Sequence, residues 1–184
     1  KIGTENILMD LSNCENTKIT FLRFATACGY SPNLRLDLVL NDFVANALST
    51  GVIEILSDGS PWRPLIDVED MARAIFWSCH RKEGSQKEIL NVGSPRWNYQ
   101  IKDLAKTVKE ILGNDIKLKI NHDASPDKRS YKVSFDKFYE LADKKFTPQI
   151  DIYESVKRMT NALTPYKNRI SREDRGHLIR LNVL

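Results

Sequence analysis

Strand-like and helix-like segments alternate along nearly the whole chain, and this alternation constrains the fold more than any other feature. Short runs rich in β-branched and aromatic residues predict strands at Thr20–Ala25, Val52–Leu56, Pro64–Ile66, Glu88–Val92 and Ile116–Ile120. Apolar residues recurring every three or four positions predict helices at Ile2–Leu11, Leu36–Ala47, Val68–His80, Ile101–Leu112, Phe135–Ala142 and Ile152–Leu163. A chain of 184 residues with this pattern is expected to form an α/β domain with its own core.

Charge and apolar content argue against two classes of partner. The net charge is +4, and residues 164–184 carry five Lys/Arg against two acids, so the rest of the chain is near neutral. That balance argues against a nucleic-acid-binding surface. No apolar run approaches the 18 residues of a membrane span, so no membrane partner is predicted.

Cysteine and histidine spacing predicts no metal site. Cys14, Cys28 and Cys79 show no CxxC spacing, and the histidines at 80, 122 and 177 are scattered. We expect each cysteine to be a small buried apolar residue. The pattern fits a reducing cytosol, and a cytoplasmic protein is expected.

Four segments, in order, resemble the C-terminal half of an extended short-chain dehydrogenase/reductase, the group of NAD-dependent sugar-nucleotide epimerases and dehydratases. They are Leu22–Pro32 (LRFATACGYSP), Gly59–Ile75 (GSPWRPLIDVEDMARAI), Glu88–Pro95 (EILNVGSP) and Asp127–Leu141 (DKRSYKVSFDKFYEL). The resemblance implies the C-terminal part of an NAD(P)-binding Rossmann-type fold. The GxxGxxG turn that approaches the dinucleotide pyrophosphate does not occur in the sequence, so NAD (or NADP) is expected to bind mainly to a missing N-terminal half.

What the resemblance implies for function is a substrate-binding part of an epimerase or dehydratase that acts on a nucleoside-diphosphate sugar through a transient keto-sugar. Lys1 stands about where the family has its catalytic lysine, with the partner tyrosine cut away; alternatively, it is simply the first residue. The fragment alone is expected to be inactive, and the intact protein to be a homodimer. The alternative is a non-catalytic binding or scaffold member of the same superfamily.

The chain is divided by this interpretation into residues 1–163, the substrate-binding part with the last Rossmann elements, and residues 164–184, a basic C-terminal tail. Asp67 is placed to cap the helix that begins at Val68, so we interpret the acids after Arg63 as a helix N-terminus and not as a catalytic site.

Arg63 is the sharpest site candidate, because RPLIDVED matches the family segment whose arginine contacts the nucleotide diphosphate. A planar guanidinium can hold two phosphate oxygens at once. The other interpretation is a surface arginine paired with Asp58 or Glu69.

The remaining candidates rest on the resemblance. Arg129 and Tyr131 lie in the late substrate segment, where an arginine often makes a second contact to the diphosphate or nucleoside, and Asn41 lies where some relatives contact the nucleotide. Cys28 and Gly29 fall in the loop that borders the nicotinamide in the family. For Asn41 a surface polar role, and for Arg129 a solvated charge, are the alternatives.

Overall fold

The fold is described from a computed structural model that covers residues 2–10, 17–121, 123–124 and 129–170. Strands and helices alternate as the sequence predicts. The elements, in chain order, are α1 (Ile2–Asp10), β1 (Ile19–Phe24), β2 (Thr26–Cys28), α2 (Val39–Thr50), β3 (Val52–Ile55), β4 (Trp62–Asp67), α3 (Val68–His80), β5 (Lys87–Val92), η1 (Pro95–Trp97), β6 (Asn98–Gln100), α4 (Ile101–Leu112), β7 (Lys117–Ile120), α5 (Asp136–Leu141), η2 (Lys144–Phe146), α6 (Ile152–Leu163) and η3 (Thr164–Arg169).

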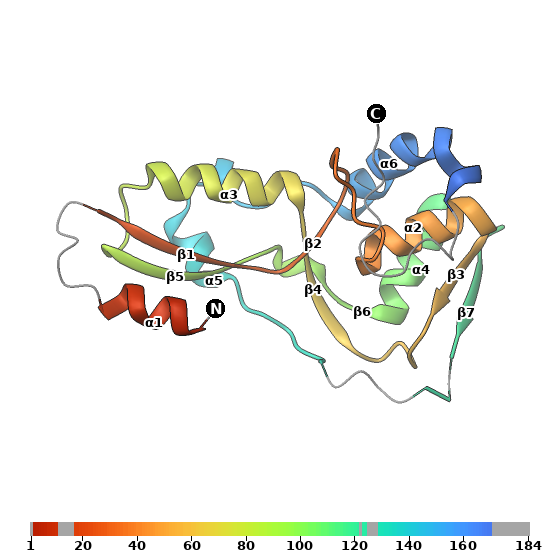
Figure 1. The fold of residues 1–184 in the computed structure, drawn as a ribbon, viewed down its shortest axis with the longest axis horizontal. Coiled ribbons are helices and arrows are strands. Elements are labelled where there is room, and N and C mark those ends of the chain that lie inside the picture. The colour runs from red at the N-terminus through yellow and green to blue at the C-terminus, as the bar shows by residue number, and fades with distance from the viewer. Residues whose placement is uncertain (1, 11–16, 122, 125–128, 171–184) are drawn as a thin grey trace.

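Three small sheets make the frame of the molecule. β1 pairs with β5, β2 with β4 and β3 with β7, all in parallel, and β6 adds to β4 in antiparallel orientation. Parallel strands need crossover connections, and helices lie within them here. Figure 1 shows α1 and α3 on opposite sides of the β1–β5 pair, while α2, α4 and α6 gather near β3 and β7. The expected α/β class is confirmed.

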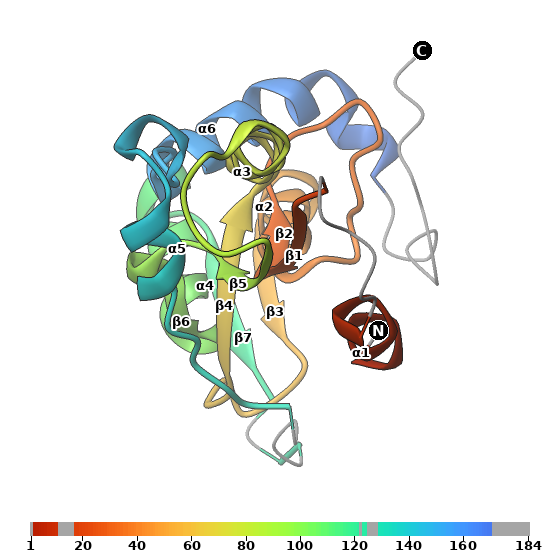
Figure 2. The same cartoon turned by 90° about the vertical axis from the view of Figure 1, so that its left-hand side faces the viewer.

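Apolar side chains form two clusters of buried residues. The larger joins α2, α4 and α6 to β3 and contains Leu40, Leu104 and Met159. The smaller joins α3 to β5 and α5, where the rings of Trp77 and Phe138 meet edge to face at 5.4 Å. Seen from the side, α6 and α3 lie along the same end of the strands (Figure 2). The larger cluster supports the candidate site described below.

Helix ends follow the predicted chemistry. The Asp67 carboxylate accepts a hydrogen bond of 2.9 Å from the backbone N–H of Glu69, which confirms the predicted cap of α3. Gly51 ends α2 with a φ of 70°, the left-handed conformation that glycine adopts without strain. The three-residue strands β2 and β6 were not predicted, because they are too short to show an alternating pattern.

An apolar face of α3 lies on the outside of the described structure. Ala72, Ile75, Phe76 and Cys79 share this face and all four are exposed, Ile75 by 48% and Phe76 by 56%. The helix packs inward through Asp70, Ala74 and Trp77 instead. The prediction of a buried cysteine is therefore wrong for Cys79 and right for Cys28, while Cys14 lies outside the described residues.

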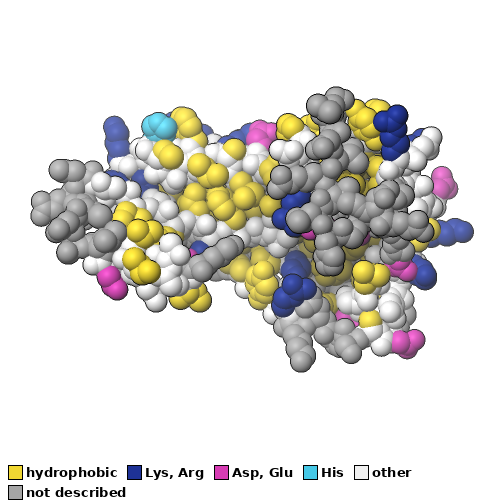
Figure 3. Space-filling view, in the orientation of Figure 1, with side chains coloured by type: hydrophobic (Ala, Val, Ile, Leu, Met, Phe, Trp, Pro, Cys, Tyr) yellow, Lys and Arg dark blue, Asp and Glu magenta, His cyan; other side chains and the backbone are white. Residues whose placement is uncertain are grey.

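β1 is an incompletely covered strand. In the described part of the chain it pairs with β5 alone, and none of its six residues is fully buried. Parallel strands are normally paired and covered on both faces. Figure 3 shows hydrophobic side chains gathered on the visible face over the region of α3, β1 and β5. This part of the molecule has the character of an interface.

Candidate functional site

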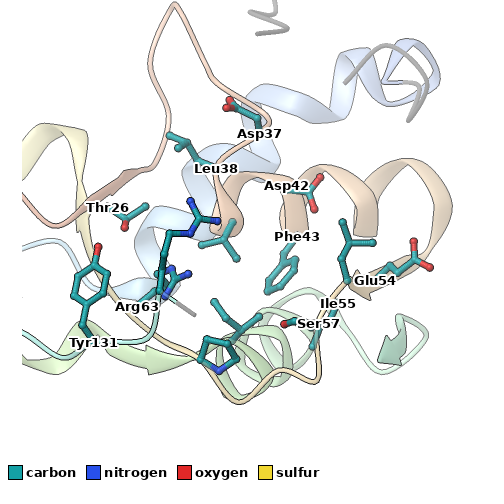
Figure 4. A pocket seen from close by; sticks show the side chains of 15 residues that line it. Thr26, Asp37, Leu38, Asp42, Phe43, Glu54, Ile55, Ser57, Arg63 and Tyr131 are labelled. Carbon is teal, nitrogen blue, oxygen red and sulfur yellow. The ribbon is translucent and has the colours of Figure 1, made fainter. Parts of the chain in front are cut away.

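A cavity of about 660 Å³ opens where the start of α2, the end of β3 and the start of β4 converge. Figure 4 shows its side chains converging from these elements. The lining residues are Thr26, Asp37, Leu38, Val39, Asp42, Phe43, Glu54, Ile55, Leu56, Ser57, Pro61, Arg63, Ile101, Arg129 and Tyr131. Three of the sequence-predicted site residues, Arg63, Arg129 and Tyr131, therefore meet in one place.

The cavity has a cationic part and an apolar part. Arg63 and Arg129 come from positions 66 residues apart and supply the two positive charges of the lining. The apolar wall includes Phe43 and Ile55, which belong to the larger core cluster and are 3% and 1% exposed. Figure 4 shows Arg63 beside Tyr131, with Phe43 farther toward the β3 side. Such an arrangement suits a ligand that carries an anionic group and a flat or apolar group.

Arg63 is held by the main chain and by an aromatic ring. Its Nη1 donates a hydrogen bond of 2.9 Å to the carbonyl oxygen of Trp62. Its guanidinium carbon lies 5.7 Å from the centre of the Tyr131 ring, within the range of a cation–π contact. A guanidinium has five N–H donors, so an arginine can keep protein partners and bind phosphate oxygens together. The alternative pairings with Asp58 or Glu69 are not among the contacts described for Arg63.

The N-terminus of α2 opens into the same cavity. Leu38 and Val39 line it, and Leu38, the N-cap residue, gives the first turn no side-chain hydrogen bond. The first N–H groups of a helix lack intrahelical acceptors and carry a partial positive charge, which favours an anion there.

Three carboxylates in the lining have partners of their own. The Arg35 guanidinium donates from Nε and Nη2 to the two carboxylate oxygens of Asp37, at 3.0 and 2.5 Å. This pairing holds the pKa of Asp37 below its ordinary value. Asn46 donates to Asp42 at 2.9 Å, and Lys119 lies 3.0 Å from Glu54. Arg35 and Lys119 bring positive charge beside Asp37 and Glu54, which offsets part of the negative charge that would otherwise oppose an anion in the cavity.

Asn41 and Gly29 lie together behind the cavity and do not line it. The Asn41 amide oxygen accepts the N–H of Gly29 at 3.0 Å, and its Nδ2 donates to the carbonyl oxygen of Arg35 at 2.9 Å. Asn41 is only 2% exposed. It therefore fixes the chain between β2 and α2, and it is not the surface polar residue that was weighed as an alternative.

Cys28 is a fully buried thiol. Its Sγ donates to the carbonyl oxygen of Ile66 at 3.3 Å. Burial, with Asp67 nearby, raises the pKa of Cys28 well above its ordinary value, so the thiol stays neutral and unreactive.

Two buried carboxylates, Asp67 and Asp70, tie α3 to the C-terminal region. The hydroxyl of Ser155 donates to Asp67 at 2.6 Å. The N–H groups of Gln149 and Ile150 donate to Asp70 at 3.0 and 3.1 Å. Burial raises the pKa of both carboxyls above the ordinary value, although these hydrogen bonds oppose the rise. Their role is structural, as the cap prediction indicates for Asp67.

Lys1, the proposed catalytic residue, lies outside the described residues. Within the described ranges, no group of three or more His, Cys, Asp or Glu side chains is placed to hold a metal ion. None of the helices in the same ranges has the length and apolar character needed to cross a membrane.

Comparison of the sequence with models of protein families identifies the family to which the chain belongs. The model of the NAD dependent epimerase/dehydratase family matches residues 1–93, half of the chain. The chain belongs to this family. The predicted resemblance is thereby confirmed.

Known members of the family are similar over most of this chain but only part of their own length. UDP-glucuronic acid decarboxylase 6 from Arabidopsis thaliana is 24% identical over 155 residues, covering 84% of this chain and 43% of the relative. UDP-glucuronic acid decarboxylase 3 from the same plant shows 24% identity and covers 84% and 44%. The chain spans less than half the length of these two relatives.

Solved structures share the fold. UDP-glucose 4-epimerase from Thermotoga maritima, crystallised with UDP-glucose, superposes with a TM-score of 0.71 and 24% identity, over 90% of this chain and 52% of that one. A mutant UDP-glucuronic acid 4-epimerase from Bacillus cereus, in complex with a UDP-sugar analogue and NAD, gives 0.72 and 17% identity, over 90% and 51%. The described fold is thus that of about half of such an enzyme, and the expectation of a Rossmann-type α/β protein is confirmed.

Proposed function

We propose that this chain is the substrate-binding part of an NAD-dependent enzyme that epimerises, dehydrates or decarboxylates a nucleoside-diphosphate sugar through a transient keto-sugar. The observation that carries the proposal is the meeting of Arg63, Arg129 and the α2 N-terminus in one cavity with an apolar wall. The diphosphate takes the cationic part, and the nucleoside lies toward Phe43 and Ile55. The relatives named above support the nucleotide-sugar class.

The work of this chain is positioning. Two arginines from separate segments restrict a dianion to one orientation, and fixing the diphosphate fixes the sugar relative to the reacting groups. Phe43 and Ile55 are part of the packed core, so the nucleoside contacts a rigid apolar surface. Bound NAD would supply the hydride acceptor and donor. Lys1 keeps its proposed role as the lysine that lowers the pKa of a catalytic tyrosine.

NAD binding is assigned mainly to a part of the protein that lies beyond this chain. Cys28 and Gly29 are both buried, and a β-carbon built at Gly29 lies 2.2 Å from the Asp67 carboxylate. Any contact that these two residues make with the cofactor is therefore assigned to their backbone. The half-exposed β1 and the outer face of α3 offer a site where the cofactor half can add to the sheet. The exposed Ile2 and Ile7 of α1 support the proposed homodimer.

Calorimetric titration of UDP into the full-length protein tests the substrate assignment. We expect Arg63→Ala to weaken UDP binding by at least about ten-fold, since a hydrogen bond to a charged group contributes about 1.5–3 kcal/mol. Arg96→Ala is the matched control, because Arg96 is exposed and lies outside this cavity. Equal affinity of the Arg63 variant and the wild type would contradict the diphosphate assignment. Absence of both UDP and NAD binding in the wild type would favour a scaffold protein.

A further inference from the structure

Arg129 belongs to an exposed segment, residues 129–133, which we call the strap. It has neither helical nor strand conformation, and residues 129–132 are all exposed. An exposed irregular segment gains conformational freedom of about 1–2 kcal/mol per residue when it detaches. The position of Arg129 in the cavity therefore depends on what holds the strap down.

One residue of β4, Trp62, makes three of the strap's contacts. Its backbone N–H donates to the Ser130 hydroxyl at 3.0 Å, and its carbonyl oxygen accepts the N–H of Tyr131 at 3.3 Å. The Lys132 ammonium lies 3.6 Å from the centre of the Trp62 ring, a close cation–π contact. The three residues that follow Arg129 are thus all attached to Trp62.

The far end of the strap is held separately. The Asn98 side chain accepts the N–H of Val133 at 3.0 Å and donates to the Val133 carbonyl oxygen at 3.1 Å. This clasp fixes where the strap ends. The contacts on Trp62 fix the part next to Arg129.

We infer that Trp62 is a positioning residue for the second arginine: by clasping Ser130, Tyr131 and Lys132 it holds Arg129 in the cavity beside Arg63. The inference rests on the proposed diphosphate site. Neither Trp62 nor Lys132 lines the cavity, so their side chains act on a ligand through the strap, whose Arg129 and Tyr131 line it. The hydrogen bond that Arg63 makes to Trp62 uses the main-chain carbonyl oxygen, so the Trp62 ring does not hold Arg63.

UDP titration of variants of the full-length protein tests this inference. Trp62→Ala leaves the two backbone hydrogen bonds possible but removes the ring beneath Lys132. We expect the UDP dissociation constant to rise about two- to five-fold, the range of a cation–π contact. Trp62→Phe keeps an aromatic face and is expected to retain most of the affinity, with both variants checked for unchanged melting temperature.

A double-mutant cycle separates an indirect effect from a direct one. In an Arg129→Ala background, Trp62→Ala is expected to add no further loss of UDP affinity, because the arginine that it positions is gone. Equal losses in the two backgrounds, or no loss in the wild-type background, would overturn the inference while leaving the diphosphate site in place.

Trypsin gives a readout that needs no ligand. It cleaves after Arg129 and Lys132, and a detached strap is cut faster. We expect faster cleavage at these two sites in Trp62→Ala than in Trp62→Phe or the wild type. Unchanged cleavage would overturn the inference. Failure of UDP to bind the wild type, by contrast, would overturn the proposed function on which it rests.

Discussion

Gly29 adopts a φ of 92°, directly against the buried Asp67 carboxylate. Two different effects therefore make a side chain at position 29 destabilising. A side chain there is strained by the left-handed backbone and also collides, at 2.2 Å, with Oδ2 of Asp67, the oxygen that accepts from the Ser155 hydroxyl, while Oδ1 of the same carboxylate caps α3. The turn after β2 and the start of α3 consequently constrain each other.

A graded series of alanine substitutions measures these costs. We expect Gly29→Ala to lower the free energy of unfolding by about 3 kcal/mol or more, since overpacking adds to the cost of the backbone conformation. Gly51→Ala, with φ of 70° and open space, should cost about 1 kcal/mol. Gly3→Ala in α1 meets nothing within 4 Å and should be neutral or slightly stabilising. Urea unfolding measures the order; a Gly29 variant no worse than the Gly51 variant would contradict it.

Asp67 gives a pH dependence of known sign. Burial raises its pKa above 3.8, so the folded protein binds this proton more tightly than the unfolded chain. Its stabilising contribution is complete below pH 3.8 and is lost as the pH rises through the folded pKa. The stability of the wild type relative to Asp67→Asn should therefore fall as the pH rises above 3.8, as pH-dependent urea unfolding can measure.

Asp58 provides the matched control of opposite sign. Hydrogen bonds from the Ser60 side chain and backbone lower the pKa of Asp58, so its contribution is lost as the pH falls. The stability of the wild type relative to Asp58→Asn should rise with pH. The same slope for both variants would contradict the assignment.

At the scale of elements, two acidic residues at the start of α3, one buried and one exposed, connect this helix to α6 and to the segment that precedes α6. Asp70 is 1% exposed and accepts two backbone N–H groups. Glu69 pairs with Arg73 on its own helix and with Arg158 of α6, but its side chain is 43% exposed. The buried Asp70 carboxylate thus accepts hydrogen bonds, whereas its neighbour Glu69 makes ion pairs that are exposed to solvent.

These adjacent acids should differ sharply when truncated. Asp70→Ala leaves the buried N–H group of Ile150 and the part-buried N–H group of Gln149 without their acceptor, and should cost about 2–4 kcal/mol of unfolding free energy. Glu69→Ala removes exposed ion pairs and should cost about 0–1 kcal/mol. Chemical denaturation of the two variants measures the difference, and equal losses would show that the exposed pairs matter more than burial predicts.

Helices with clear ends were predictable from the sequence. Val68–His80, Ile101–Leu112 and Ile152–Leu163 have the predicted bounds because caps and apolar periodicity act locally. Periodicity shows which residues share a face but not which face meets the core, so it does not reveal that Phe76 is exposed.

The candidate site was predictable only in part. Arg63 and Arg129 were recognised through the family resemblance, and the structure brings them to one cavity. The clasp of Trp62 on the strap was not predictable, because Ser130 lies 68 residues away in the sequence and no local pattern pairs them. Likewise, the buried role of Asn41 depends on its contact with Gly29, 12 residues earlier.

At the scale of the whole molecule, the two core clusters have different surroundings. The larger is covered by α2, α4 and α6, whereas the smaller lies beside the half-exposed β1 and the outward apolar face of α3. The proposed substrate cavity adjoins the larger cluster, and the proposed junction with the cofactor half adjoins the smaller. Substrate binding should therefore survive without the cofactor half, and NAD binding should not.

Thermal unfolding of the 184-residue chain alone tests this separation. A ligand that binds only the folded state raises the melting temperature, and its stabilising free energy grows with the logarithm of the ratio of ligand concentration to dissociation constant. We expect UDP at about 100 times its dissociation constant to stabilise the chain by about 2.7 kcal/mol. NAD at the same concentration should produce no shift, and a shift by NAD comparable with that by UDP would contradict the assignment.

The partly exposed strand β1 has a consequence for how the specificity of proteins in this family can change. A strand joins a sheet through main-chain hydrogen bonds, which every residue except proline can make, so the join places few demands on sequence. Substitutions around Arg63, Arg129 and the apolar wall lie away from that join and change what is recognised without disturbing it. Under the proposed function, selection can therefore exchange one sugar nucleotide for another in this part while the hydride chemistry assigned to the cofactor half is inherited intact.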